Sequence, residues 1–203
     1  VTANRILTPS IMGFDALYVL IQTVLVFTFG GGLVLSMSEP LRYGMEVALM
    51  VAFSFLLYRW LFTGGGKSLH LMLLVGIVLG TMFRGMSSLL QRLIEPSEFI
   101  ILQDLFFASF NNVDGALLGY SLIAVAVVSV PAWRMRHSLD VMSLGRETSI
   151  NLGVNHKRSV TGVLVICSVL VAVSTALVGP VTFFGLLVAS LAYQLCSHFS
   201  HKA

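Results

Sequence analysis

Long runs of apolar residues, separated by short polar stretches, dominate the chain. Six runs stand out, at about Ala16–Ser38, Gly44–Tyr58, Ser68–Leu90, Gly115–Trp133, Val160–Val178 and Val181–Cys196. A helix needs about 20 apolar residues to cross a bilayer, whereas a transmembrane barrel strand alternates apolar and polar residues over about 10. The pattern therefore predicts an all-α fold, a polytopic α-helical membrane protein with six spans.

The last two apolar runs are separated by a Gly-Pro pair and not by a charged residue. No Asp, Glu, Lys or Arg occurs from Ser159 to His201, a stretch too long for one span. Proline cannot donate a hydrogen bond to a helix and glycine permits a sharp turn. We therefore expect Gly179 and Pro180 to end the fifth span and to separate it from a shorter sixth span.

The composition excludes several classes of soluble protein. Of the 203 residues, 57% are hydrophobic and only 10% are charged, against about 25% charged in an ordinary soluble domain. So few charges cannot cover a water-soluble globule, which excludes a soluble enzyme, a nucleic-acid-binding domain and a disordered chain. The net charge of +3 is small and scattered, so we expect a lipid bilayer and no nucleic acid as the partner.

The basic residues predict the orientation of the spans. With the N-terminal segment in the cytoplasm, nine of the twelve Lys and Arg residues fall on the cytoplasmic side. Only Arg42, Arg84 and Arg92 fall on the other half of the membrane. Because cytoplasmic loops carry an excess of Lys and Arg, we expect both ends of this segment to be cytoplasmic.

Two loops are long enough to form structure of their own. The outer loop, residues 91–114, contains an amphipathic stretch at Phe99–Phe107 that predicts a helix lying at the interface. The inner loop, residues 138–155, alternates apolar and polar residues, and Gly145 and Gly153 suit caps or turns between two short helices. The inner loop is either a docking surface or an ordinary interfacial loop, and the residue pattern alone favours the ordinary loop.

Motifs that would indicate chemistry are incomplete. The segment Phe62–Ser68 contains Gly-Gly-Gly-Lys-Ser, but Leu61 stands where a phosphate-binding loop needs glycine. Cys196, His198 and His201 are too few for a closed metal site. No Ser/His/Asp set or carboxylate pair lies within the spans. We therefore expect no catalytic residues, no metal and no cofactor bound by this chain.

One charge interrupts the third apolar run. Arg84 comes about 16 residues after Ser68, which places it ~24 Å along a helix and close to the outer surface. A charge within a span is often functional because it is costly in lipid, but a long arginine side chain near the end of a span can snorkel. Both interpretations stay open.

The G-x-x-x-G sequences at Gly76–Gly80 and Gly115–Gly119 predict close packing between helices of this chain.

Three stretches resemble the permease family of iron-siderophore and cobalamin ABC importers. Asn4–Gly13 is similar to that family's N-P-L-A-x-P-x-x-L-G, Leu144–Val154 to its L-G-x-x-x-A-x-x-L-G-V, and Val178–Val188 to its A-G-P-I-x-F-V-G-L-I-V. Their order and spacing agree, and the resemblance spans nearly the whole chain. The chain departs from these patterns where Ser149 replaces the usual Ala, and where Ala189, Ser190 and Tyr193 replace P-H-x-x-R. The second departure resembles a branch whose permease pairs with a second, different permease.

The resemblance implies a ten-helix permease, of which residues 1–203 would form helices three to eight of a single, partial permease domain. Residues 138–155 would be the coupling helices that seat in a cytoplasmic ABC ATPase, with contacts from Leu144, Gly145, Arg146, Ser149, Leu152, Gly153 and Val154. Pathway and gating residues would be Gly179, Pro180, Phe183, Gly185 and Arg84. The permease would lie in the bacterial inner membrane, and ATP hydrolysis would belong to the ATPase.

The same resemblance implies the cargo and the remaining partners. A periplasmic siderophore-binding protein would deliver a ferric siderophore to the outer loops, and cobalamin and haem are alternative cargoes within the family. A second permease subunit would complete the pathway. The rival classes are an ion-gradient-driven secondary transporter or channel and a membrane scaffold that transports nothing. Apart from Glu46 near one end, the spans lack buried carboxylates, which argues against proton coupling.

Overall fold

The computed structural model describes residues 13–63, 69–107, 110, 113–181 and 184–195, and their regular structure is entirely α-helical, as predicted. The helices are α1 (Phe14–Phe29), α2 (Gly31–Ser36), α3 (Glu39–Thr63), α4 (Leu69–Gln91), α5 (Pro96–Phe106), α6 (Gly115–Arg134), α7 (Arg136–Met142), α8 (Arg146–Asn151), α9 (His156–Val178) and α10 (Phe184–Leu195).

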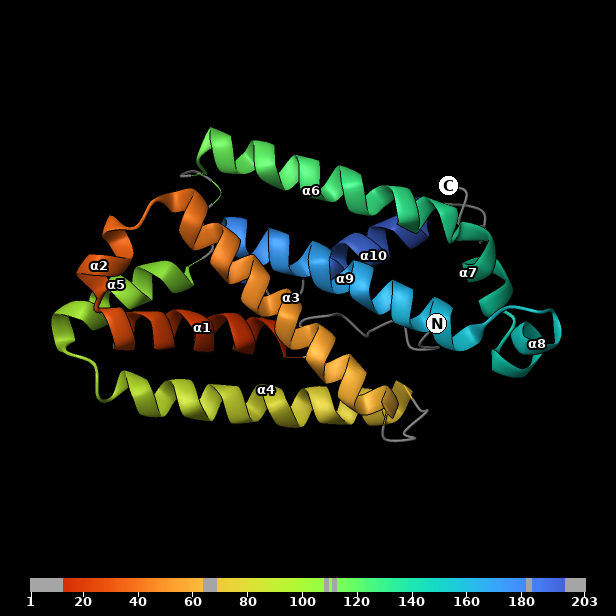
Figure 1. Cartoon of the computed structure of the whole chain (residues 1–203), viewed down its shortest axis with the longest axis horizontal. Helices are drawn as coiled ribbons and strands as arrows, with labels where there is room; N and C mark the ends of the chain where they lie inside the picture. Colours follow the sequence, from red (N-terminus) through yellow and green to blue (C-terminus); the bar gives the residue numbers. More distant parts are fainter. Residues whose placement is uncertain (1–12, 64–68, 108–109, 111–112, 182–183, 196–203) are drawn as a thin grey trace.

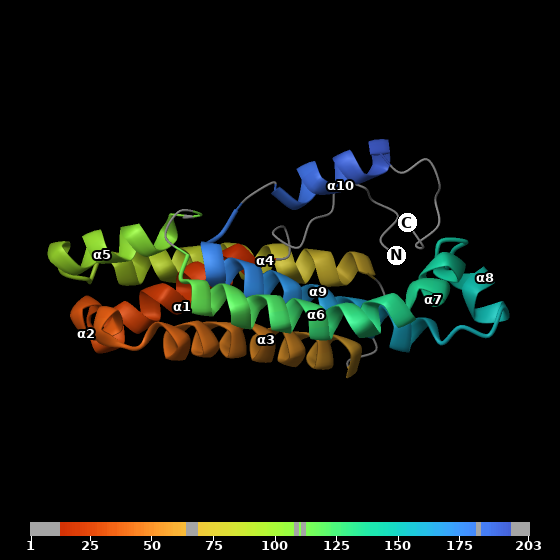
Figure 2. The same cartoon turned by 90° about the horizontal axis from the view of Figure 1, so that it is seen from above.

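The long helices form an elongated bundle with short helices at both ends (Figure 1). Helix α1 packs mainly on α4, and α9 packs on both α3 and α6. Helices α2 and α5 lie at one end, which we name the α2/α5 end, and α7 and α8 lie at the opposite end (Figure 1). Figure 2 shows that α10 lies to one side of the bundle.

Four helices are long and apolar enough to cross a membrane, at Glu39–Leu57, Leu74–Gln91, Gly115–Arg134 and Arg158–Val178. They correspond to the second to fifth predicted spans, and they make the chain a multi-pass membrane protein. The count of six spans is not confirmed. Helix α10, in the predicted sixth span, has 12 residues.

The first predicted span, Ala16–Ser38, was wrong as a continuous helix, because the structure breaks it at Gly30. Gly30 has φ 78° and ψ 148°, a backbone conformation that is essentially restricted to glycine. The helix before the break, α1, therefore has 16 residues, and the helix after it, α2, has six. Helix α1 begins about halfway along α4 (Figure 1), so that it accompanies only the half of α4 toward the α2/α5 end.

Glycines permit a close approach between α1 and α4. A Cβ atom at Gly13, which has φ 87°, would lie 3.0 Å from the carbonyl oxygen of Gly76 and 3.0 Å from the Cα of Gly80. The prediction of close intrachain packing is therefore confirmed for Gly76–Gly80. It is wrong for Gly115–Gly119, where a Cβ at either glycine would meet nothing within 4 Å, so no close contact there requires glycine.

The outer loop contains the predicted helix, α5, which packs against the corner between α1 and α2. Leu102 is fully buried and belongs to the same apolar cluster as Leu25, Val26 and Val34. The Gly31 N–H donates a hydrogen bond of 3.3 Å to the Glu98 carboxylate. Helix α5 is thus packed into this end of the bundle, and its place at the membrane interface stays a prediction.

We expect Leu102→Ala to detach α5 from the bundle. Removing a fully buried leucine leaves a cavity and costs about 2–5 kcal/mol, and an 11-residue helix has little stability of its own. Hydrogen exchange of the α5 amides should therefore become much faster in the variant. The matched control is Ile100→Ala, whose side chain is mostly exposed on the same helix and whose loss should leave exchange unchanged. Equal exchange in both variants would contradict this packing.

Candidate functional site

Helices α7 and α8 form a compact protrusion between α6 and α9 (Figure 1), and both contact α9. These are the two short helices expected in residues 138–155. Met142, the last residue of α7, is buried in a cluster with Val160 and Leu164 of α9. This cluster anchors the protrusion to the bundle through α9.

Two glycines set the geometry of the protrusion, as the sequence predicted. Gly145 joins α7 to α8 with φ 99° and ψ 165°, and Gly153 follows α8 with φ 83°. The Gly145 carbonyl accepts a 3.0 Å hydrogen bond from the Ser149 N–H, and the Ser149 carbonyl accepts one of 3.0 Å from the Val154 N–H. These bonds fix the start and the end of α8. The positive φ angles at both glycines are unfavourable for residues that carry a side chain.

An apolar surface remains exposed on the protrusion. Leu144 and Leu152 are 61% and 59% exposed, and Ile150, which sequence reasoning did not include among the coupling residues, is 50% exposed. Its position in the same alternating pattern was the signal that could have found it. Ser149 is fully buried, which restricts its position to a small side chain, and Val154 packs against the Met142 cluster. Arg146 begins α8, and its side chain lies outside the described residues.

The residues predicted for gating flank the break between α9 and α10. Gly179 ends α9 with φ 96° and ψ 173°, and its N–H donates a 2.8 Å hydrogen bond to the Thr175 carbonyl. Pro180 follows it, so the predicted helix end is confirmed. Gly185 is an exposed residue in the first turn of α10, and Phe183 lies outside the described residues. Arg84, in contrast, lies on α4.

The Arg84 side chain extends back along α4, away from the α2/α5 end. A Cβ built on Gly80 would lie 3.7 Å from Arg84 Nη2, and Gly80 is the middle residue of the 23-residue helix α4. This direction follows the tilt of Cα–Cβ bonds toward the helix N-terminus. The Arg84 side chain is thus directed toward the middle of α4 and not toward its C-terminal end. The roles proposed from the sequence, in function or in snorkelling, stay predictions.

Sequence reasoning named the buried carboxylate of Glu46 but missed its contact with Gln22. Glu46 on α3 is almost fully buried, and its carboxylate lies 3.7 Å from Arg42 Nε. Gln22 on α1 is equally buried and lies within hydrogen-bonding reach of Glu46. Gln22 Oε1 and Glu46 Oε1 have no hydrogen-bond partner. A lone amide within the first apolar run was the available signal for this contact between α1 and α3.

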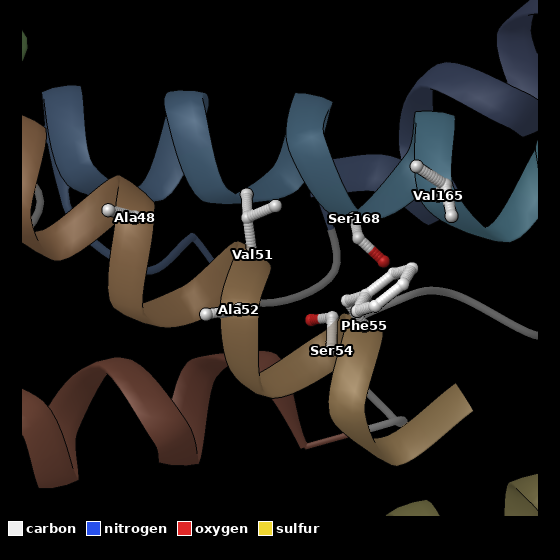
Figure 3. A pocket seen from close by; sticks show the side chains of 7 residues that line it. All are labelled: Ala48, Val51, Ala52, Ser54, Phe55, Val165 and Ser168. Atoms are coloured by element: carbon white, nitrogen blue, oxygen red, sulfur yellow. The ribbon is translucent and has the colours of Figure 1, made fainter. Parts of the chain in front are cut away.

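A hollow of about 310 Å³ lies between α3 and α9 (Figure 3) and offers no chemistry. Its walls are apolar except for Ser54 and Ser168. These hydroxyls donate to the carbonyls of Met50 at 2.8 Å and of Leu164 at 2.7 Å on their own helices. The described part of the chain also contains no group of three or more His, Cys, Asp or Glu residues that could hold a metal ion. The set at Cys196, His198 and His201 lies outside it.

Fold and site together define a multi-pass α-helical membrane protein with a two-helix protrusion at one end. The FecCD transport family matches residues 1–203, and the chain belongs to that family. The resemblance to permeases of iron-siderophore importers is thereby confirmed.

Two curated relatives match along the whole chain. The chain is 45% identical over 202 residues to the petrobactin import system permease protein YclO of Bacillus subtilis (strain 168), of which the match covers 64%. It is 40% identical over 202 residues to the petrobactin import system permease protein FatC of Bacillus anthracis, of which the match covers 57%. The chain thus spans less than two thirds of the length of these relatives.

A solved structure shares the fold. A metal-chelate type ABC transporter, described in an inward-facing conformation, superposes with a TM-score of 0.78 at 21% sequence identity. The superposition covers 96% of this chain and 60% of the other.

Proposed function

We propose that this chain forms the membrane-spanning part of an ABC importer permease that carries ferric siderophores across the bacterial inner membrane. The observation that carries this proposal is the 45% identity to YclO along all of the chain, because YclO is a petrobactin import permease. Petrobactin is the first candidate cargo. The iron(3+)-hydroxamate permease FhuB of Escherichia coli (strain K12) matches at only 26% over 131 residues, and cobalamin and haem are further alternatives.

A separate ABC ATPase supplies the energy, and this chain hydrolyses nothing itself. The exposed apolar residues Leu144, Ile150 and Leu152 form the surface that docks on the ATPase, together with the predicted contact residue Arg146. A rigid pair of short helices anchored on α9 by Met142 is suited to convert movement of the ATPase into movement of the spans. Gly145, Ser149, Gly153 and Val154 hold that pair in shape.

The α7/α8 end faces the cytoplasm, with both ends of this segment on that side. The distribution of charge supports this orientation, because Arg59, Arg134 and Arg158 lie at the ends of membrane-spanning helices there and Arg136 begins α7. The α2/α5 end carries the acidic residues Glu39, Glu95, Glu98 and Asp114. A periplasmic siderophore-binding protein docks at that end, and a second permease subunit completes the pathway, with Gly179, Pro180, Phe183 and Gly185 at the gate.

One observation favours an ion-gradient-driven transporter as the second candidate. Glu46 is a buried carboxylate within a span, as proton-coupled transporters require. It lies one helical turn from Arg42, however, and the arginine Nε at 3.7 Å from the carboxylate favours a structural role for Glu46.

The cargo is tested in a Bacillus subtilis strain that lacks YclO and carries the full-length protein in its place. We expect uptake of ⁵⁵Fe-labelled ferric petrobactin to be restored, and we expect no uptake of cobalamin or haem. The control is the same strain without the protein. If only the uptake of ferric hydroxamates were restored, a hydroxamate siderophore would replace petrobactin as the proposed cargo. If no iron uptake were restored, the proposed function would be contradicted.

A further inference from the structure

Helix α4 presents three different faces in its half toward the α2/α5 end. The first is buried against α1 and contains Gly80, Phe83 and Ser87. The second is exposed and apolar, and contains Met82, Met86, Leu89 and Leu93. The third is exposed and polar or small, and contains Thr81, Arg84, Gly85 and Ser88. These four residues share one side of the helix because their spacing is i, i+3, i+4 and i+7.

The polar face of α4 is not suited to contact lipid. Arg84 places its guanidinium beside Gly80, which is the middle residue of α4 and lies within the candidate membrane span Leu74–Gln91. Within the described ranges, Arg84 makes no ion pair that would offset its charge. A guanidinium in hydrocarbon is strongly unfavourable, so the side chain requires water or an anion. The apolar face only one residue further round the helix is the surface that suits lipid.

We propose that the polar face of α4 lines the route of the cargo and that Arg84 selects a negatively charged ferric chelate there. This inference rests on the proposed function. Three catecholate or hydroxycarboxylate donors bring more negative charge than Fe³⁺ cancels, whereas three hydroxamate donors leave the complex neutral. A guanidinium offers five N–H donors in a planar arrangement that matches paired oxygen atoms of an anion. Arg84 thus makes the middle of the pathway favourable for an anionic chelate over a neutral one.

Charged thiol reagents test whether the polar face of α4 is accessible to water and whether the charge of Arg84 attracts anions there. They require no assumption about the cargo. The full-length importer is prepared with every native cysteine replaced by serine, Cys167 and Cys196 among them. A single cysteine is then introduced as Thr81→Cys, three residues before Arg84. An anionic and a cationic methanethiosulfonate then compete for this cysteine in membrane vesicles. We expect Thr81→Cys to react, with a preference for the anionic reagent that falls about tenfold or more with Arg84→Gln and is retained with Arg84→Lys.

Two further cysteines control this measurement. Met82→Cys lies on the apolar face and should not react with either reagent. Ser88→Cys lies on the polar face and replaces Thr81→Cys if the latter lowers the amount of folded importer. Absence of reaction at both polar-face cysteines would overturn the proposal, as a carboxylate or an apolar surface of a second subunit covering Arg84 would produce that result. A preference for the anionic reagent that is the same in Arg84→Gln as in the unmodified protein would also overturn the proposal.

Uptake measurements then test the selection itself. We expect Arg84→Gln to lower the uptake of ferric petrobactin about tenfold or more and Arg84→Lys to retain most of it. The matched control is Arg92→Gln, which removes one charge just beyond the outer end of α4 and should change uptake less than about twofold. Equal losses in Arg84→Gln and Arg92→Gln, or no loss in Arg84→Gln, would overturn the proposal. If the unmodified importer transports no ferric chelate, the proposed function fails, and the thiol reactions alone decide the role of Arg84.

Discussion

Gly145→Val in the full-length protein should abolish ATP-driven uptake while the protein still inserts into the membrane. Gly145 has φ 99° and ψ 165°, a conformation that costs about 1–3 kcal/mol for other residues and more for a β-branched one. An added Cβ would meet nothing within 4 Å, so the effect acts through the backbone and not through a clash. Because α8 has only six residues, its own hydrogen bonds cannot hold the original geometry against this strain.

The measurement is the stimulation of ATPase activity by the loaded binding protein, together with iron uptake. In a variant whose α8 has turned away from α7, Leu144 and Leu152 no longer form the surface proposed to dock on the ATPase. ATPase stimulation and iron uptake should therefore be lost together. Gly119→Val is the matched control, because Gly119 lies within α6 and an added Cβ there also meets nothing within 4 Å. Normal ATPase stimulation and normal uptake in Gly145→Val would contradict the role given to α7 and α8.

Gly80→Leu should strongly destabilise the bundle by separating α1 from α4. A Cβ at Gly80 would lie 3.1 Å from the Cα of Gly13, and backbone atoms cannot move aside as the end of a side chain can. Overpacking a close contact typically costs about 1–3 kcal/mol, and the larger leucine places further atoms in the same seam. We expect less folded protein in the membrane and a clearly lower melting temperature in detergent.

Gly85→Leu provides the comparison for this stability measurement. Gly85 is on the same helix, but an added Cβ there meets nothing within 4 Å, so the melting temperature should stay close to that of the unmodified protein. Equal melting temperatures for Gly80→Leu and the unmodified protein would show that the packing of α1 on α4 does not depend on the close contact between Gly13 and Gly80.

Local signals explain why much of the fold was predictable from the sequence. Long and mainly apolar runs predicted the helices that became α3, α4, α6 and α9, although Glu46 and Arg84 lie within two of them. Gly179–Pro180 correctly marked the end of α9. The break at Gly30 was not predictable in the same way, because the apolar run continues through it. The chain turns there because the conformation of Gly30 lets α2 pack on α5, a contact between residues that are distant in the sequence.

The candidate site follows the same division. The glycines at 145 and 153 and the alternating apolar residues are local, so the shape of the α7–α8 protrusion could be predicted. The approach of the Arg84 guanidinium to Gly80 was not predicted, because a long arginine side chain on the surface of a helix can adopt several rotamers. The approach of Gln22 to Glu46 depends on how α1 packs against α3, which no local pattern encodes.

The central claim is that ATP hydrolysis by a partner drives a ferric chelate through this permease. The most direct test uses proteoliposomes that contain the full-length permease, its ATPase and its binding protein, loaded with ⁵⁵Fe-labelled ferric petrobactin. We predict uptake that requires ATP and continues when proton and sodium gradients are collapsed. Uptake that follows an imposed ion gradient in the absence of ATP would contradict the account.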